Sequence, residues 1–196
     1  MKLIIQIPCL NEEASLPITL KDLPERIDGI DSIETLVIDD GSTDKTVEVA
    51  QKHNVNHILK FTNNKGLAKA FMYGMNHALK LGADIIVNTD ADNQYFGGDI
   101  AKLIQPILNK KADIVIGNRQ VETIRHFSPI KIFLQKFGSW IVGQLSGTTI
   151  PDATSGFRAY SREAALQMNV VSDFTYTVET IISAGKKNLA IEHIPV

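Results

Sequence analysis

Two aspartates and a glutamine, at positions 90, 92 and 94, form the pattern in this chain with the clearest chemical meaning. They belong to the run Asp90-Ala91-Asp92-Asn93-Gln94, which follows the apolar segment 84–88. Side chains two residues apart in an extended segment point to the same side, so both carboxylates can approach one cation. Oxygen ligands of this kind suit Mg²⁺ or Mn²⁺, which commonly hold substrate phosphates. We therefore predict a divalent metal site at Asp90, Asp92 and Gln94; the alternative is an acidic turn that caps the next helix.

A second acidic cluster, Asp39-Asp40-Gly41-Ser42-Thr43-Asp44, follows the apolar run 36–38. Ser42, Thr43 or Asp44 can cap the helix that comes next. Two adjacent carboxylates exceed what a helix cap needs. Asp39 or Asp40 is therefore expected to accept hydrogen bonds from a nucleobase or a ribose.

The segment Pro8-Cys9-Leu10-Asn11-Glu12-Glu13 ends the first apolar run of the chain. In a nucleotide site, the backbone around Pro8 and Leu10 would flank the base and Glu12 would lie near the sugar. A plain turn between a strand and a helix is the alternative.

Positively charged side chains in the second half of the chain are candidates for binding phosphate. Arginine forms paired hydrogen bonds with phosphate oxygens, and lysine acts as a point charge. The candidates are Arg119, Arg125, Lys131, Lys136 and Arg158. Arg119 and Arg158 stand beside glycine-containing strand ends or turns, which favours them, whereas Arg125 and Lys136 are better interpreted as solvated surface charges.

Short apolar strands alternate with amphipathic helices along the chain. Strands are predicted near 3–7, 36–38, 57–61, 84–88, 114–116, 157–160 and 190–196. Helices are predicted near 14–26, 47–50, 66–81 and 99–108, with two more helical stretches between 160 and 190. This alternation indicates βαβ units and a mostly parallel sheet, and the continuous apolar strands indicate a sheet covered on both faces.

The polar clusters fall where ligands bind in such a sheet. In open α/β sheets, ligands bind beyond the carboxyl ends of the strands. The clusters at 8–13, 39–44, 88–94 and 117–119 all follow predicted strands. We therefore expect them to converge on one edge.

Composition and missing motifs exclude several classes of protein. A chain of 196 residues suits one domain with a real core. Cys9 is the only cysteine, which excludes an intrachain disulfide and a cysteine-based zinc cage and fits a reducing cytosol. The formal charge of -2 gives no basic footprint for nucleic acid. Without G-x-G-x-x-G, G-x-x-x-x-G-K-[ST] or G-x-S-x-G, the Rossmann dinucleotide, P-loop and hydrolase interpretations lose support.

Residues 124–149 mix aromatic and aliphatic side chains with Arg125, Lys131 and Lys136. This pattern is expected to contact a lipid surface as an amphipathic helix, slightly ahead of a helix that packs on the body. No stretch approaches the ~20 apolar residues of a membrane span, so the chain as given is expected to be soluble. Because it ends on a strand-like run, a longer natural chain is expected, and transmembrane helices could lie beyond Val196.

In this order, the segments resemble glycosyltransferase family 2, the inverting enzymes of GT-A fold, and most of all the branch of dolichyl- and polyprenyl-phosphate sugar synthases. Residues 7–13 are similar to I-P-x-x-N-E-E, 37–44 to V-x-D-D-G-S-x-D and 64–70 to N-x-G-x-x-x-A. Three further runs resemble D-x-D-x-Q, G-S-R and D-x-x-S-G-F-R-x-Y, at 90–94, 117–119 and 152–160. The resemblance implies an α/β, Rossmann-like GT-A domain over 1–196, in which 1–119 binds a nucleotide sugar and 120–196 faces the acceptor.

The resemblance also implies roles for single residues. The nucleoside pocket would be lined by Pro8, Leu10, Glu12, Ile38 and Asp40, and the wider nucleotide-sugar site would add Asp39, Lys65, Asp90, Ala91 and Asp92. The metal would lie at Asp90, Asp92 and Gln94, with Asp92 and Gln94 the favoured ligands. Asp92 and Arg119 would be catalytic, and the acceptor phosphate would meet Arg119, Lys131 and Arg158. The branch has Tyr, Leu and Arg where this chain has Leu10, Asn93 and Lys131.

The implied reaction moves a hexose from a nucleotide-diphosphate sugar to a polyprenyl phosphate, with inversion, at the cytoplasmic face of a membrane. A divalent ion would stabilise the charge on the leaving diphosphate. An acceptor phosphate is already ionised, so positioning by cations would dominate. A saccharide or lipid hydroxyl acceptor is the alternative, and it would need a base, for which Glu179 is the candidate. GDP-linked and UDP-linked donors both stay open.

Two other functions compete with this interpretation. A sugar nucleotidyltransferase normally has a glycine-rich loop after its first strand, and residues 8–13 contain no glycine. A non-catalytic nucleotide-binding or receiver-type module would use Asp39 and Asp40, but it leaves D-x-D-x-Q without a role.

Overall fold

The apolar strands predicted from the sequence form one central sheet. The computed structural model describes residues 1–119, 138–144, 147, 150–170 and 175–196. In these residues seven strands form one sheet, namely β1 Lys2–Cys9, β2 Ser32–Asp39, β3 His57–Lys60, β4 Ile85–Asn88, β5 Ile114–Asn118, β6 Arg158–Ser161 and β7 Ile191–Pro195. The helices are α1 Leu16–Asp22, α2 Thr46–Lys52, α3 Leu67–Lys80, the short 3₁₀ helix η1 Gly97–Asp99, α4 Ile100–Leu108, α6 Arg162–Gln167 and α7 Tyr176–Lys186, and the described residues 138–144 are helical as well.

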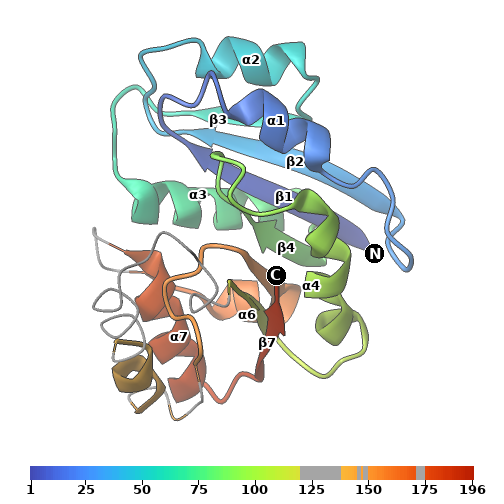
Figure 1. Cartoon of the computed structure of the whole chain (residues 1–196), viewed down its shortest axis with the longest axis vertical. Helices are drawn as coiled ribbons and strands as arrows, with labels where there is room; N and C mark the ends of the chain where they lie inside the picture. Colours follow the sequence, from blue (N-terminus) through green and yellow to red (C-terminus); the bar gives the residue numbers. More distant parts are fainter. Residues whose placement is uncertain (120–137, 145–146, 148–149, 171–174) are drawn as a thin grey trace.

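The sheet is mostly parallel, as predicted. Its strand order is β3-β2-β1-β4-β6-β5-β7, and β6 runs antiparallel to both of its neighbours, β4 and β5. The alternation of strands and helices did not predict this reversal. Because β6 and β7 join strands from the first half of the chain, 1–119 and 120–196 share one sheet (Figure 1). The division of these halves between donor and acceptor stays a prediction.

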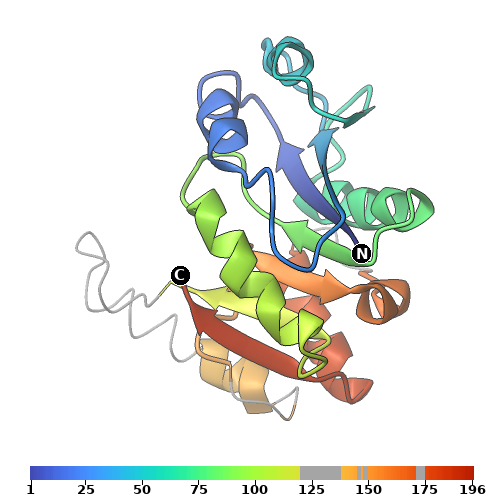
Figure 2. The same ribbon diagram turned by 90° about the vertical axis from the view of Figure 1, so that its right-hand side faces the viewer.

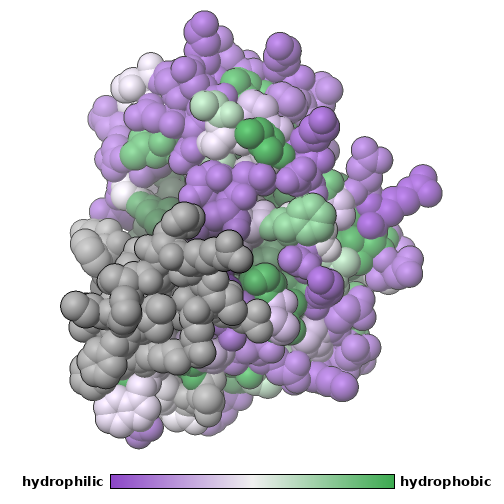
Figure 3. Space-filling view, in the orientation of Figure 1, coloured by the Kyte–Doolittle hydropathy of each residue, from purple (hydrophilic) through white to green (hydrophobic). Residues whose placement is uncertain are grey.

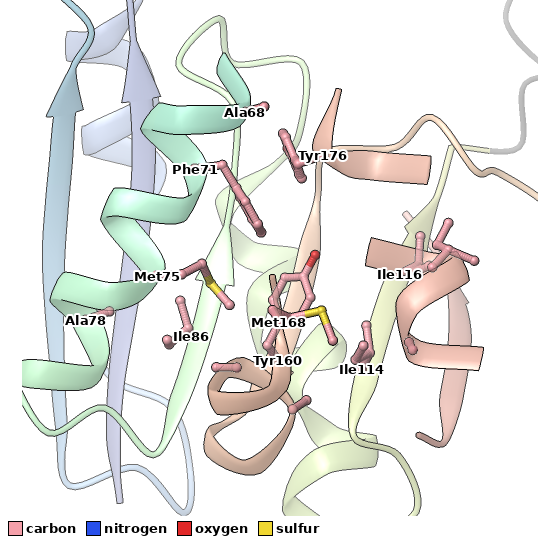
Figure 4. Packing of buried hydrophobic residues seen from close by; sticks show 14 of the residues in the cluster. Ala68, Phe71, Met75, Ala78, Ile86, Ile114, Ile116, Tyr160, Met168 and Tyr176 are labelled. Carbon is pink, nitrogen blue, oxygen red and sulfur yellow. The ribbon is translucent and has the colours of Figure 1, made fainter. Parts of the chain in front are cut away.

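Helices cover both faces of the sheet, so the central strands β1, β4, β6 and β5 are buried on both faces, whereas the edge strands β3 and β7 are only partly buried. Ile4, Ile38 and Ile86 pack on the side of α3, α6 and α7, whereas Leu3 and Ile5 pack on the side of α1, α2 and α4. The turned view in Figure 2 shows α3 and α4 on opposite sides of the strands. Figure 4 shows one of these two cores, in which side chains of α3 meet those of β6 and α7.

Some predicted boundaries differ from those observed. The helix predicted over 14–26 is limited to α1, Leu16–Asp22, since Pro24 disfavours a helical backbone at Leu23, which is extended with ψ 141°. Pro17 occupies the first turn, where a proline is tolerated. β1 continues through Pro8 to Cys9, and β2 begins at Ser32.

The hydropathy of the surface and the length of the helices are the features that concern contact with a membrane. On the face seen in Figure 3, hydrophilic residues predominate over α1 and α2, and hydrophobic ones appear there in small separate groups. None of the helices formed by the described residues combines the length and the apolar character needed to cross a bilayer. Most of the predicted amphipathic segment, including Arg125, Lys131 and Lys136, lies outside the described residues. Residues 138–144 are helical, and Trp140 is 59% exposed there.

Candidate active site

Three of the four predicted polar clusters meet at one cavity of about 290 Å³ beyond the carboxyl ends of β1, β2 and β4. Its lining residues come from the loops after these strands and from the start of α3. They are Pro8, Cys9, Leu10, Glu12, Asp40, Asn64, Leu67, Ala70, Asp90, Ala91 and Asp92. Parallel strands bring their carboxyl ends to the same edge, and this is why residues so distant in sequence converge.

Hydrogen bonds between side chains and backbone hold the first two loops together. The backbone N–H of Asn11 donates to Ser42 Oγ (2.9 Å), and that of Thr43 donates to Asn11 Oδ1 (2.8 Å). Asn11 has a φ of 58°, a left-handed conformation in which asparagine is enriched. The N-cap position of α2 is Lys45, and of the three predicted capping residues Asp44 contacts the helix start: its Oδ1 accepts from the backbone N–H of Thr46 (2.9 Å). These contacts fix the side of the cavity that Leu10 and Glu12 line.

The two adjacent aspartates have different surroundings. Asp40 lines the cavity, and its carboxylate accepts from the backbone N–H groups of Lys65 (2.7 Å) and Gly66 (2.9 Å) at the start of α3. Asp39 is fully buried; one oxygen accepts from the Ser42 N–H (3.2 Å), and the other has no hydrogen-bond partner among the described residues. Of the two alternatives left by the sequence, the structure brings Asp40 and not Asp39 to the cavity.

Two other predicted nucleotide contacts lie away from the cavity lining. The prediction for Ile38 is wrong, because Ile38 is fully buried in the core beneath α3, where its side chain packs against Gly74. The Lys65 side chain is exposed and its ammonium lies over the rings of Phe61 (4.7 Å) and Tyr73 (5.3 Å), while its backbone N–H binds Asp40; a contact of the Lys65 side chain with a nucleotide stays a prediction. Residue type and spacing do not reveal which way a side chain points. For this reason the sequence did not separate Ile38 from the residues that line the cavity.

The predicted metal ligands lie together at the end of β4. Gln94 Nε2 donates to Asp90 Oδ2 (2.6 Å), and the Gln94 backbone N–H donates to Asp92 Oδ1 (3.2 Å). Burial, and then the nearby Asp92 carboxylate, raise the pKa of Asp90 above its usual range. Two carboxylates that repel each other in this way fit a divalent cation. No cluster of three or more His, Cys, Asp or Glu is present in the described ranges, so the third ligand would come from the Gln94 amide after it turns its oxygen inward.

Arg119, which follows β5, binds the loop that precedes β6. Its Nε and Nη2 donate to the two carboxylate oxygens of Asp152 (2.8 and 3.0 Å), and Nη2 also donates to Thr154 Oγ1 (2.7 Å). Burial alone would raise the pKa of Asp152, but the hydrogen bonds and charge of Arg119 hold that pKa below its usual range. The Arg119 side chain keeps 20% of its surface exposed, whereas that of Asp152 keeps 2%. Arg119 is thus held rigidly at the surface.

The prediction that Arg158 binds an acceptor phosphate is wrong. Arg158 is fully buried, and its guanidinium donates to the backbone oxygens of Ser155 (2.7 Å), Thr177 (2.7 Å) and Ala153 (2.8 Å) and to Thr180 Oγ1 (2.9 Å). No ligand reaches a group enclosed in this way. Arg158 instead ties the loop before β6 to α7.

This structural role can be tested by unfolding. Arg158→Met would leave three buried carbonyls and a hydroxyl without their donor, at about 1–3 kcal/mol for each unsatisfied group. We expect the free energy of unfolding in urea to fall by at least about 3 kcal/mol. Lys102→Met is the control, because Lys102 makes a surface ion pair with Asp99, and such pairs contribute about 0–1 kcal/mol. Equal stability of the two variants would contradict the assignment.

The remaining predicted residues are placed as follows. Glu179 lies in the first turn of α7, partly exposed, and is not among the residues that line the cavity. Lys131 lies outside the described residues. The sequence interpretation missed Asn64 at the cavity and Asp152 as the partner of Arg119. Both residues had a signal, because Asn64 opens the N-x-G-x-x-x-A run and Asp152 opens the D-x-x-S-G-F-R-x-Y run.

The mixed sheet with one reversed strand and helices on both faces is a GT-A fold. The chain belongs to glycosyl transferase family 2, whose family model matches residues 4–167. The resemblance seen in the sequence motifs is thereby confirmed.

Relatives in sequence support the branch as well as the family. An uncharacterized protein of Methanocaldococcus jannaschii is 34% identical over 204 residues, covering 100% of this chain and 80% of the relative. The UDP-N-acetylglucosamine–dolichyl-phosphate N-acetylglucosaminyltransferase of Methanococcus voltae is 32% identical, covering 97% of this chain and 82% of that enzyme. The undecaprenyl-phosphate mannosyltransferase of Micrococcus luteus is 27% identical, covering 100% and 83%. These names confirm the resemblance to the polyprenyl-phosphate branch.

A solved structure supports the fold. Glucosyl-3-phosphoglycerate synthase from Mycobacterium tuberculosis, crystallised with Mn²⁺, UDP and phosphoglyceric acid, superposes with a TM-score of 0.79. The match covers 99% of this chain and 68% of that one, at 19% sequence identity. At this identity the comparison establishes the GT-A fold.

Proposed function

We propose that this protein transfers a hexose from a UDP- or GDP-linked sugar to a polyprenyl phosphate, with inversion and with a divalent cation. The observation that carries the proposal is the pairing of two features at one sheet edge. One is a cavity with an apolar wall and a carboxylate pair, and the other is Arg119, which follows β5, is oriented by the buried Asp152 and interacts electrostatically with Asp90 of the cavity. The relatives named for dolichyl- and undecaprenyl-phosphate transfer support the acceptor.

The nucleoside would bind between the loops after β1 and β2. Leu10 and Leu67 line the cavity and are 42% and 49% exposed, so they offer apolar contact to a flat base. Asp40 and Asn64 add polar groups that can hydrogen-bond a base or a ribose. Glu12 also lines the cavity, and in this proposal it lies near the sugar of the nucleoside.

The diphosphate would lie at the end of β4. Asp90, Asp92 and the amide oxygen of Gln94 would hold Mg²⁺ or Mn²⁺, which when bound supplies a Lewis acid to the leaving diphosphate. The M. tuberculosis structure, crystallised with Mn²⁺ and UDP, supports this assignment. Asp90 and Asp92 also line the cavity floor, so the same carboxylates orient the donor.

The acceptor phosphate would meet Arg119 on the opposite side from the leaving group. The phosphate oxygen that attacks the anomeric carbon carries negative charge already, so it needs orientation more than a base. The Asp152 carboxylate fixes the Arg119 guanidinium for this purpose. A hydroxyl acceptor would need a base, and Glu179 in the first turn of α7 stays the candidate for that role.

Because the proposed acceptor is a membrane lipid, the site would work at a membrane surface, and we propose the cytoplasmic face. The exposed Trp140 and Ile141, on the helical residues 138–144, support peripheral contact there. In this proposal the protein binds no nucleic acid.

Donor binding can be tested by thermal unfolding with GDP, UDP and their sugar conjugates, each with Mn²⁺ or EDTA. A ligand that binds only the folded state raises the melting temperature by mass action. At a ligand concentration of 100 times Kd, the free energy of unfolding rises by about 2.7 kcal/mol. We expect one nucleotide to raise the melting temperature in Mn²⁺ and to lose most of this effect in EDTA. If none of these nucleotides and nucleotide sugars raises the melting temperature, the proposed function is wrong.

A further inference from the structure

A short segment without regular structure, residues 152–157, lies between the two halves of the proposed site. At one end, Asp152 binds Arg119 through two hydrogen bonds. At the other end, Gly156 lies against Asp90: a Cβ at position 156 would be 2.8 and 2.9 Å from the two Asp90 carboxylate oxygens. We call residues 152–157 the connector, because it touches both the donor-side carboxylate and the acceptor-side arginine.

Side chains hold the connector backbone along its length. Asp152 Oδ1 accepts from the N–H groups of Thr154 (3.2 Å) and Ser155 (3.1 Å), and Arg158 donates to the carbonyls of Ala153 and Ser155. A loop held in this way behaves as a rigid element, because its buried polar groups have partners in one arrangement only.

Two tyrosines and an asparagine anchor the end of the connector that touches Asp90. The Gly156 N–H donates to Tyr95 Oη (3.2 Å), and Asn88 Nδ2 donates to the Gly156 carbonyl (2.9 Å). Asn88 Nδ2 also donates to Tyr176 Oη (3.0 Å), and Asn88 Oδ1 accepts from Gln6 Nε2 (2.9 Å).

These anchors are buried and come from separate parts of the chain. Gln6 and Asn88 are fully buried, Tyr176 is 1% exposed and Tyr95 is 5% exposed. Apolar side chains would fill this part of the core without the desolvation penalty of a polar group. Each buried polar group here instead needs a hydrogen-bond partner. The arrangement therefore specifies one position of Gly156, and with it the position of Asp90 relative to the connector.

We propose that Tyr95, Asn88 and Tyr176 are positioning residues that hold the connector so that Asp90 and Arg119 keep one fixed separation. The roles of Asp90 and Arg119 in this inference rest on the proposed function. The sugar donor and the acceptor phosphate are then placed by a single rigid element, and transfer needs both placements at once. Hydrolysis of the donor by water needs only the donor side.

The test compares transfer with hydrolysis in Tyr95→Phe and Tyr176→Phe. Each variant removes one hydroxyl and keeps the ring, which stacks on Phe157 at 5.0 Å in the case of Tyr95 and on Phe71 at 3.9 Å in the case of Tyr176. The control is Tyr160→Phe. Tyr160 is fully buried and also packs against Phe71, and in the part of the chain that the structure describes its hydroxyl binds neither the connector nor Asn88, whereas the Tyr176 hydroxyl is linked to the connector through Asn88.

The donor is the nucleotide sugar that binds the wild-type protein, and the acceptor is a short-chain polyprenyl phosphate, with Mn²⁺ present. In transfer, the bond between the anomeric carbon and the nucleoside diphosphate breaks as the acceptor phosphate oxygen forms its bond to that carbon. In hydrolysis, water takes the place of the acceptor and gives the free sugar. Both reactions release the nucleoside diphosphate.

We expect kcat for transfer to fall about tenfold in Tyr95→Phe and Tyr176→Phe, with KM for the donor and the rate of hydrolysis within about twofold of wild type. Tyr160→Phe is expected to match wild type in all three. A merely structural role would lower transfer and hydrolysis together, in proportion to the folded fraction, and that result would overturn the inference. Unchanged transfer in both variants would overturn it as well.

The wild-type protein separates this inference from the proposed function. If the wild type hydrolyses the donor and transfers nothing to polyprenyl phosphate, the assigned acceptor is wrong. If the wild type transfers the sugar and the two tyrosine variants transfer it equally well, the acceptor is right and the positioning role is wrong.

Discussion

Asp92→Asn is expected to lower kcat/KM for sugar transfer by about 10²–10³-fold, the loss typical when one electrostatic contact to a developing charge is removed. Asp92 is exposed at the cavity, so its carboxylate has no packing role to confuse the result. Its one described hydrogen bond is accepted by Oδ1 from the Gln94 N–H, and an asparagine Oδ1 can accept the same bond. The substitution therefore removes a charge and leaves the loop in place.

Three measurements check this prediction. Nucleotide binding in Mn²⁺ should weaken towards the level seen with EDTA, and the melting temperature of the free protein should stay unchanged. Asp99→Asn, the same substitution in η1 outside the cavity, should keep transfer within about twofold of wild type. Full activity of Asp92→Asn would contradict the metal site at Asp90, Asp92 and Gln94.

Arg119→Lys is expected to lower transfer to the acceptor by about 10²-fold while leaving donor binding unchanged. Lysine keeps the positive charge, but it lacks the planar fork that binds two carboxylate oxygens and presents further donors to a phosphate. Because Arg119 does not line the nucleotide cavity, UDP or GDP should raise the melting temperature as in wild type. Loss of nucleotide binding would contradict the assignment of Arg119 to the acceptor side.

The pair with Asp152 allows a sharper version of this test. Arg119→Met alone leaves a buried carboxylate without its cation, and breaking a buried pair in this way costs about 3–5 kcal/mol of stability. Adding Asp152→Asn removes that charge and should recover most of the lost stability. Transfer should stay low in the double variant. Recovery of transfer together with stability would show that Arg119 acts only through folding.

The sequence predicted the sheet and the position of the site because both follow from short patterns. Apolar strands ending in acidic loops indicated a parallel sheet with one functional edge, and the cavity between Leu10, Asp40 and Asp92 lies at that edge. The reversal of β6 was not predicted, since strand direction depends on which strand pairs with which, and this is set by contacts between residues more than 65 positions apart.

Side-chain direction was the main source of error at the site. Arg158 and Arg119 look alike in sequence, each two residues after a glycine, yet one guanidinium is enclosed by carbonyls and the other reaches the surface. Ile38 and Asp39 stand next to Asp40, but both are fully buried beneath the cavity wall. The anchoring roles of Asn88 and Tyr176 were not predicted, because the role of a polar residue inside a strand or a helix is known only when its hydrogen-bond partners are known.

The most direct test of the proposed function is the structure of the product. The wild-type protein is incubated with Mn²⁺, the α-linked nucleotide sugar that stabilises it and a short-chain polyprenyl phosphate, and the product is analysed by mass spectrometry and by NMR of the anomeric centre. We predict a polyprenyl phosphate carrying one hexose in a β-linkage, formed with Mn²⁺ and not with EDTA. A sugar attached to a hydroxyl group, an α-linked product, or release of free sugar alone would contradict it.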